Sequence, residues 1–244
     1  MKLSTPEEAL IAAIIVGTTL ASYALGRVLS IPILVPFLNT LASFPFMVLA
    51  LKRGDVGRAI ARMLVWAATM TVCATLLSYA RPVETARLFV RAAAYRNEMV
   101  AWVMTGRGAE STPSVFIPQQ AGQAAVFSAL ALASGGTLAM PMGAVLMNDM
   151  GYYVGTLAAM SRRRPLLTMV LAWPPWAVIR IASFVAIGVV LSTPLLARVF
   201  GFRVNWTSAQ TPLAVAGAGL VADVVLKWLL APAWQRLLLR LVTG

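Results

Sequence analysis

The sequence contains no histidine and only one cysteine, and both shortages exclude kinds of site. Histidine is the most common general base, metal ligand and haem ligand, so its absence removes the usual routes to such sites. Cys73 lies inside an apolar run and has no second cysteine with which to form an intrachain disulfide or a thiolate cluster. We therefore expect no metal site and no cofactor, and we interpret Cys73 as a small buried hydrophobic residue.

Charged residues are also scarce. They make up 11% of the 244 residues, whereas soluble domains contain about 25%. Hydrophobic residues make up 60% of the chain, and the mean hydropathy is +0.82. A water-soluble fold of this size could not bury so much apolar surface, so we expect lipid around its outer face. The composition predicts an integral membrane protein.

The few charges that are present are mostly basic, with 20 Lys and Arg against 8 Asp and Glu, for a net charge of +12. In a soluble protein this excess would suggest nucleic acid as a partner. Here the basic residues flank apolar runs, which is typical of loops held on the cytoplasmic side of a membrane. We therefore expect contacts with anionic lipid head groups and none with nucleic acid.

Six apolar runs are long enough to cross the hydrocarbon core of a bilayer, which is roughly 30 Å thick. They predict an all-α fold, a polytopic helix bundle that forms a single transmembrane domain over residues 1–244. In the first run, Gly17 and Ala21 have the small-xxx-small spacing that favours close helix approach. In the fifth run, Pro174 and Pro175 predict a break. The runs cover residues 8–29, 31–51, 63–79, 140–160, 166–196 and 212–230.

Residues 81–121 have a different pattern, which predicts an amphipathic helix over 83–104 followed by a loop. Polar and charged side chains fall mostly on one face of this helix, and apolar side chains recur every three or four residues on the other. Such a helix lies along the membrane interface or packs on the bundle. The recurring apolar residues are Leu88, Ala92, Tyr95, Met99 and Trp102.

The apolar stretch over residues 121–160 is too long for one span, because a helix of that length would measure about 60 Å. Gly135, Gly136 and Pro141 are the expected breakpoints. We interpret residues 121–140 as a re-entrant or broken segment and the second half as one crossing. Two crossings, which would give seven spans, are the alternative.

The re-entrant interpretation also sets the orientation. It places the basic loops 52–62 and 162–164 on the same side of the membrane, together with both termini. We expect that side to be the cytoplasm of a bacterial-type cell inner membrane.

Four ionisable residues and one amide lie inside apolar runs, where a charge at mid-membrane costs about 2.5–3.5 kcal/mol on insertion scales. Asp223 and Lys227 have the i, i+4 spacing of an intrahelical ion pair. Arg180 is then expected to pair with Asp149 on the neighbouring helix, so that Asn148, Asp149 and Arg180 form a buried polar focus. These charges could equally serve to hold a bundle together, and the long Arg180 and Lys227 side chains could reach the interface.

Two further segments carry candidate binding groups. Gly135, Gly136 and Thr137 could open a broken helix whose free backbone groups bind a ligand, or they could form a tight turn between two helices. Three glutamines, Gln119, Gln120 and Gln123, lie near a membrane edge. Gln119 and Gln123 are four residues apart, so they can line one helix face, or they can be solvated in a loop.

Three functions fit these patterns. We favour a small-solute or ion permease, or the membrane subunit of one, because of the intramembrane charges and the broken helices. A non-catalytic structural or assembly subunit, bound to partner subunits or to copies of itself, is the alternative. An enzyme that acts on lipid, with Asp149 as its base, has the least support, because the sequence contains no catalytic motif and no histidine.

Overall fold

The computed structural model describes residues 5–244, and this part of the chain folds into helices without a β-strand. The long helices are α1 (Thr5–Leu29), α4 (Val56–Ala80), α7 (Pro113–Ser134), α8 (Ala139–Met160), α10 (Pro175–Phe200) and α11 (Trp206–Thr243). The shorter elements are η1 (Pro32–Leu34), α2 (Val35–Leu41), α3 (Phe44–Lys52), α5 (Pro82–Leu88), α6 (Ala92–Thr105), η2 (Ala109–Ser111) and α9 (Pro165–Leu171).

Six helical segments are long and apolar enough to cross a membrane by their length and composition, which is compatible with an integral membrane protein. Five of them are α1, α4, α7, α10 and α11, and the sixth combines η1, α2 and α3. As Pro174 and Pro175 predicted, the 166–196 run is broken: α9 ends at Leu171 and α10 begins at Pro175.

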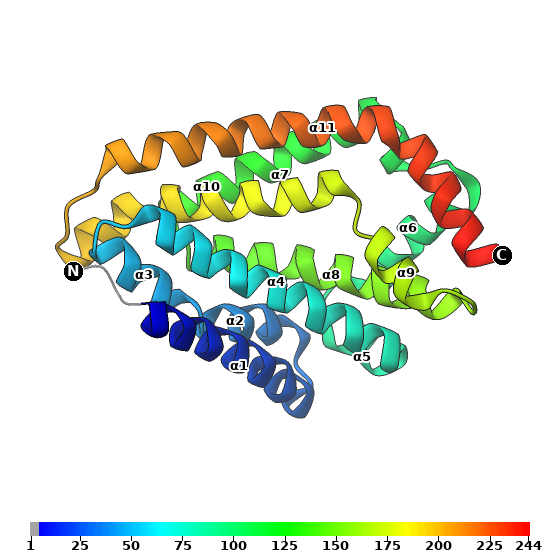
Figure 1. Ribbon diagram of the computed structural model, residues 1–244, viewed down its shortest axis with the longest axis horizontal. Coiled ribbons are helices and arrows are strands. Elements are labelled where there is room, and N and C mark those ends of the chain that lie inside the picture. The colour runs from blue at the N-terminus through cyan, green and yellow to red at the C-terminus, as the bar shows by residue number, and fades with distance from the viewer. Residues whose placement is uncertain (1–4) are drawn as a thin grey trace.

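Helix α8 covers the predicted span 140–160 and is as long as α7, but it is not apolar enough to belong to the six segments. It lies in the middle of the bundle. In Figure 1 it runs between α4 and α10, and it packs against α2, α4, α6, α7 and α9. Every residue from Met147 to Ala158 is buried. A helix covered by protein on all sides does not need a uniformly apolar surface, which explains why α8 tolerates Asn148 and Asp149.

The contact between α8 and α4 depends on two glycines of α8. A Cβ atom at Gly151 would lie 2.5 Å from the Ala74 Cβ, and a Cβ at Gly155 would collide with the backbone oxygen of Thr75. The missing side chains therefore let the two backbones approach closely. At Gly17, where we expected a close approach, a Cβ would meet nothing within 4 Å.

The predicted segment over residues 121–140 is broken at Gly135 and Gly136, as expected, but it is not re-entrant. Residues 113–134 form the single helix α7, and a short turn connects it to α8, which runs back beside it (Figure 1). Gly135 ends α7 with a φ of 59°, and Gly136 follows with a φ of 90°. Both residues have the left-handed backbone that glycine adopts without strain, so the pair forms the tight turn that was the alternative interpretation.

The predicted continuous helix over 83–104 is also wrong, because it is split into α5 and α6. Phe89 has an extended backbone, and its ring packs edge-on against Tyr23 of α1 at 6.1 Å between ring centroids. The break thus lets Phe89 turn into the core. The inward-facing side was predicted correctly: Leu88, Ala92, Met99 and Trp102 are buried, and α5 and α6 both pack against α8.

We predict that Gly155→Ala destabilises the protein by about 1–3 kcal/mol, because the added methyl group has to push α4 and α8 apart. The matched control is Gly217→Ala on α11, where a Cβ meets nothing within 4 Å and the helix propensity of alanine is favourable. The measurement is thermal unfolding in detergent, followed by circular dichroism at the helix band. Equal melting temperatures for the two variants would contradict the proposed close contact.

Candidate functional site

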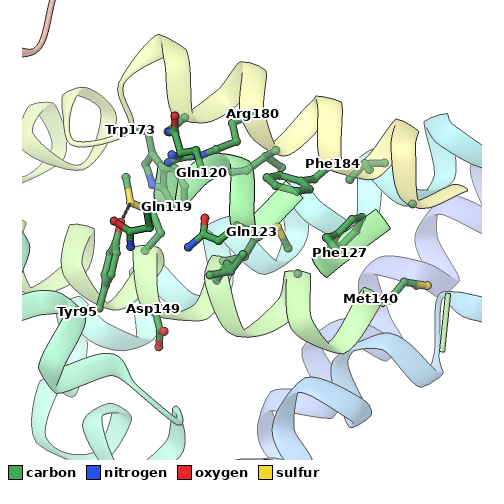
Figure 2. Close-up of a pocket in the computed structure, with 18 of the residues that line it drawn as sticks. Tyr95, Gln119, Gln120, Gln123, Phe127, Met140, Asp149, Trp173, Arg180 and Phe184 are labelled. Carbon is green, nitrogen blue, oxygen red and sulfur yellow. Dashed lines mark hydrogen bonds between the residues drawn. The ribbon is translucent and has the colours of Figure 1, made fainter. Parts of the chain in front are cut away.

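A cavity of about 140 Å³ lies inside the bundle and is lined mainly by α7, α8 and α10. Figure 2 shows its polar lining gathered at one end, with Gln119 and Gln120 from α7 and Arg180 from α10. Phe127 and Phe184 line the other end. We treat this cavity as the candidate functional site, because interior clefts with a few convergent polar groups are the usual binding sites of proteins.

Arg180 forms an ion pair with Asp223 of α11, with 3.8 Å between its Nη1 and the Asp223 Oδ2. The same carboxylate oxygen accepts a hydrogen bond of 3.0 Å from the Gln120 Nε2. The Asp223 side chain is 1% exposed, whereas that of Arg180 is 21% exposed. Within this pair the Asp223 carboxylate is therefore buried, whereas the Arg180 guanidinium is partly exposed.

Lys227 of α11 pairs with Glu110, which lies in η2 between α6 and α7. The distance from the Lys227 Nζ to the Glu110 Oε1 is 2.7 Å, and the ammonium group also lies 4.6 Å from the centroid of the Phe116 ring. The expected intrahelical pair between Asp223 and Lys227 is therefore wrong, because each residue takes its ion-pair partner from another element.

The expected pair between Asp149 and Arg180 is wrong as well. Asp149 lies near Arg91, but no ion pair joins the two among the described residues, and the buried Asp149 Oδ1 has no hydrogen-bond partner there. Arg91 is the N-cap residue of α6, where a negative charge is favourable. Figure 2 shows the Asp149 carboxylate turned away from the glutamines and Arg180. Asp149 thus borders the cavity, but its carboxylate points away from the polar end.

Asn148 belongs to a separate buried network on the side of α8 that faces α1, α2 and α4. It accepts a hydrogen bond of 2.5 Å from the Tyr23 hydroxyl, and its Nδ2 donates to the Asn39 Oδ1 at 3.1 Å. The Asn39 Nδ2 in turn donates to the Ser22 Oγ at 2.8 Å. Of the predicted focus, Asn148 therefore lies apart from the cavity, whereas Asp149 and Arg180 both border it without forming a pair.

The turn at Gly135, Gly136 and Thr137 lies outside the wall of the cavity. Its polar groups are used within the turn itself. The Thr137 hydroxyl donates to the Ser134 backbone oxygen at 2.9 Å, and the Leu138 N–H donates to the Ser134 Oγ at 3.0 Å. These contacts favour the turn over an open, ligand-binding helix end.

Of the predicted polar residues, the cavity brings together Asp149, Arg180 and Lys227 with the three glutamines, which line one face of α7 instead of lying in a loop. Sequence reasoning missed Glu110 and Tyr95 as wall residues. Glu110 is separated from Lys227 by 117 positions and lies in a segment that reads as a loop, so no spacing rule connects the two. Tyr95 was expected only on the inward face of an amphipathic helix.

No protein-family model, no curated protein and no solved structure matches the chain significantly, so a function can be argued only from the geometry of the site.

We predict from this geometry that Lys227 is energetically coupled to Glu110 more strongly than to Asp223. Removing one member of a buried ion pair leaves the other without its partner, so double-mutant cycles should give about 0.5–3 kcal/mol for the paired residues. The cycle combines Lys227→Met with Glu110→Gln, and the matched cycle combines Lys227→Met with Asp223→Asn. Stability is measured by denaturant titration in detergent. A larger coupling energy in the matched cycle would contradict this prediction and support the intrahelical pair of Asp223 and Lys227.

Proposed function

We propose that this chain is a multi-pass integral membrane protein that acts as a permease for a small solute, or as the membrane subunit of one. The observation that carries the proposal is the partly polar cavity within a bundle whose outer helices are apolar. Amide and guanidinium groups at that depth replace the hydrogen bonds that a solute loses when it leaves water. Five of the six segments of membrane-spanning length contribute residues to the cavity wall, which supports its placement within a bilayer.

The buried charges fit this role because they are compensated. Arg180 with Asp223, and Lys227 with Glu110, form two neutral pairs beside the cavity. Pairing lowers the cost of holding charges at membrane depth, where ionisable residues usually mark a substrate or ion pathway.

The lipid-enzyme alternative is weakened by the same geometry. It required Asp149 as a base acting together with arginine, and the Asp149 carboxylate is turned away from Arg180 and the glutamines (Figure 2). The assembly-subunit alternative requires stoichiometric partners, which the test below also detects.

We predict that Gln123→Leu lowers solute flux severalfold, because it removes an amide from the cavity wall without touching either ion pair. Purified protein is reconstituted into liposomes, and stopped-flow light scattering follows the entry of glycerol, glycine, sodium acetate or potassium chloride. At least one solute should enter faster than into protein-free liposomes. Gln210→Leu, at an exposed position of α11, is the matched control and should retain the full rate.

Folded protein that moves none of the four solutes faster than empty liposomes do would contradict the proposal. Recovery of a stoichiometric partner protein after mild detergent extraction, together with absent flux, would favour the assembly subunit.

The distribution of charge supports a new orientation. One end of the bundle carries α5, α6, α9 and the end of α11, and the other carries the α3–α4 and α10–α11 connections (Figure 1). Two contacts agree with this division. Ser161 contacts Leu241 at the first end, and Lys52 contacts Phe200 at the other end. Segments 81–107, 162–164 and 236–240 at the first end contain ten Lys and Arg residues, against six in 52–62 and 198–203.

Cytoplasmic loops carry the excess of Lys and Arg, so we place the α5, α6 and α9 end in the cytoplasm, next to anionic lipid head groups. Because α1 begins and α11 ends at opposite ends of the bundle, this proposal replaces the expectation that both termini are cytoplasmic.

We predict the labelling pattern of two single-cysteine variants made in a Cys73→Ala background. Thr207→Cys, at the start of α11, should react with a membrane-impermeant maleimide in intact cells. Thr105→Cys, at the end of α6, should react only after permeabilisation. Both threonines are exposed and neutral, so the substitutions leave the charge distribution unchanged. The reverse pattern would overturn the orientation, and labelling of both from outside would overturn the division into two ends.

A further inference from the structure

The two ends of the cavity differ in chemistry, and this difference points to the class of molecule that fits. Figure 2 shows Gln119, Gln120 and Arg180 at one end and Phe184 and Phe127 at the other. A uniformly polar solute would leave the aromatic end unused, and a uniformly apolar one would leave the amides and the guanidinium without partners. A molecule with one polar end and one apolar end satisfies both.

The size of this molecule follows from the helices that line the cavity. Arg180 and Gly188 both border it and are eight residues apart on α10, which corresponds to about 12 Å along the helix axis. Gln120 and Phe127 of α7 border it in the same order, seven residues apart. A single medium-length chain matches this length.

The charge of the polar end is set by Arg180. Its ion pair with Asp223 is long, at 3.8 Å, and the Asp223 Oδ2 already accepts a hydrogen bond from Gln120 at 3.0 Å. The guanidinium group has five N–H donors, so this single contact leaves most of them unused. Arg180 therefore offers the cavity a positive group with a donor geometry suited to a carboxylate.

Each of the other charged residues that border the cavity is ion-paired, points away from the polar end or lies at the exposed rim. Glu110 is held by Lys227 at 2.7 Å, and the Asp149 carboxylate is turned away from Arg180 (Figure 2). Glu98 and Arg91 are exposed and have opposite charges. Arg180 thus remains the charged group that a ligand inside the cavity would meet.

The apolar end is formed by an aromatic pair that packs closely on two glycines. A Cβ atom at Gly188 would lie 3.1 Å from the Phe127 ring, and one at Gly143 would lie 3.5 Å from it. The Phe127 ring in turn packs edge-on against Phe184, with centroids 4.9 Å apart. An alkyl chain that enters the cavity from its polar end would therefore meet these two rings.

We infer that the cavity binds a single-chain carboxylate, with its head group on Arg180 and its chain extending toward Phe184 and Phe127. The inference deepens the proposed permease function by naming its substrate class, and it rests on the same cavity.

The head-group test compares three probes that share one alkyl chain. Protein in nanodiscs is titrated with octanoate, octylammonium or octanol by calorimetry, with empty nanodiscs as the blank. Octanoate should bind saturably and at least about tenfold more tightly than the other two, as expected for a charge-assisted hydrogen bond. Arg180→Gln should remove that preference, and Arg198→Gln, at an exposed position of the same helix, should keep it.

The chain-length test uses the apolar end. Gly188→Leu adds a bulky side chain beside Phe127, so it should weaken octanoate binding while leaving butyrate binding unchanged. Gly143→Leu is a second variant with the same expected effect, in case the first does not fold. Equal binding of octanoate and octylammonium, or octanoate binding that survives both Arg180→Gln and the glycine substitutions, would overturn the inference.

The binding and flux results separate the two proposals. If octanoate binds as described but no solute crosses proteoliposomes, the permease is wrong and the ligand class stands. If flux depends on Gln123 but octanoate does not bind, the ligand class is wrong and the permease stands.

Discussion

The polar interior of this bundle depends on the close contact between α8 and α4. Gly151 and Gly155 let the two backbones meet, and α8 is thereby enclosed on all sides by other helices. Enclosure lowers the free-energy cost of polar side chains on α8, because they contact protein groups instead of acyl chains. It also gives α8 two different sides. Asn148 completes the amide and hydroxyl network with α1 and α2, and the opposite side of the helix forms a wall of the cavity.

The buried ion pairs follow a second constraint, which is that each joins two different elements. Asp223 pairs with Arg180 of α10, and Lys227 pairs with Glu110 of η2. Such contacts join η2, α10 and α11 around the polar end of the cavity. A pair between helices fixes their relative position, which an intrahelical pair cannot do. In its pair with Asp223, the Arg180 side chain stays partly exposed, and the inferred ligand class depends on that exposure.

Much of the fold could be predicted from the sequence because its signals are local. Apolar runs located every long helix except α7, Pro174 and Pro175 located a break, and the apolar period over 83–104 identified the inward side. The ion-pair partners could not be predicted, because distance along the chain does not reveal which helix faces share an interface. For the same reason Gly17 and Gly151 look alike in sequence, although only Gly151 lies at a close contact. The re-entrant interpretation failed because a count of basic loops was used to decide a question of helix packing.

The central claim is that α8 is the protein-enclosed helix of a lipid-embedded bundle, with the cavity on one of its sides. Reconstitution with a phospholipid that carries a photoreactive group in its acyl chain tests this claim most directly, with cross-linked peptides identified by mass spectrometry. The account predicts heavy cross-linking to α1, α7 and α11, whose apolar side chains are largely exposed, and little to Met147–Ala158 of α8. Cross-linking of α8 as strong as that of α11, or the absence of cross-links to any helix, would contradict it.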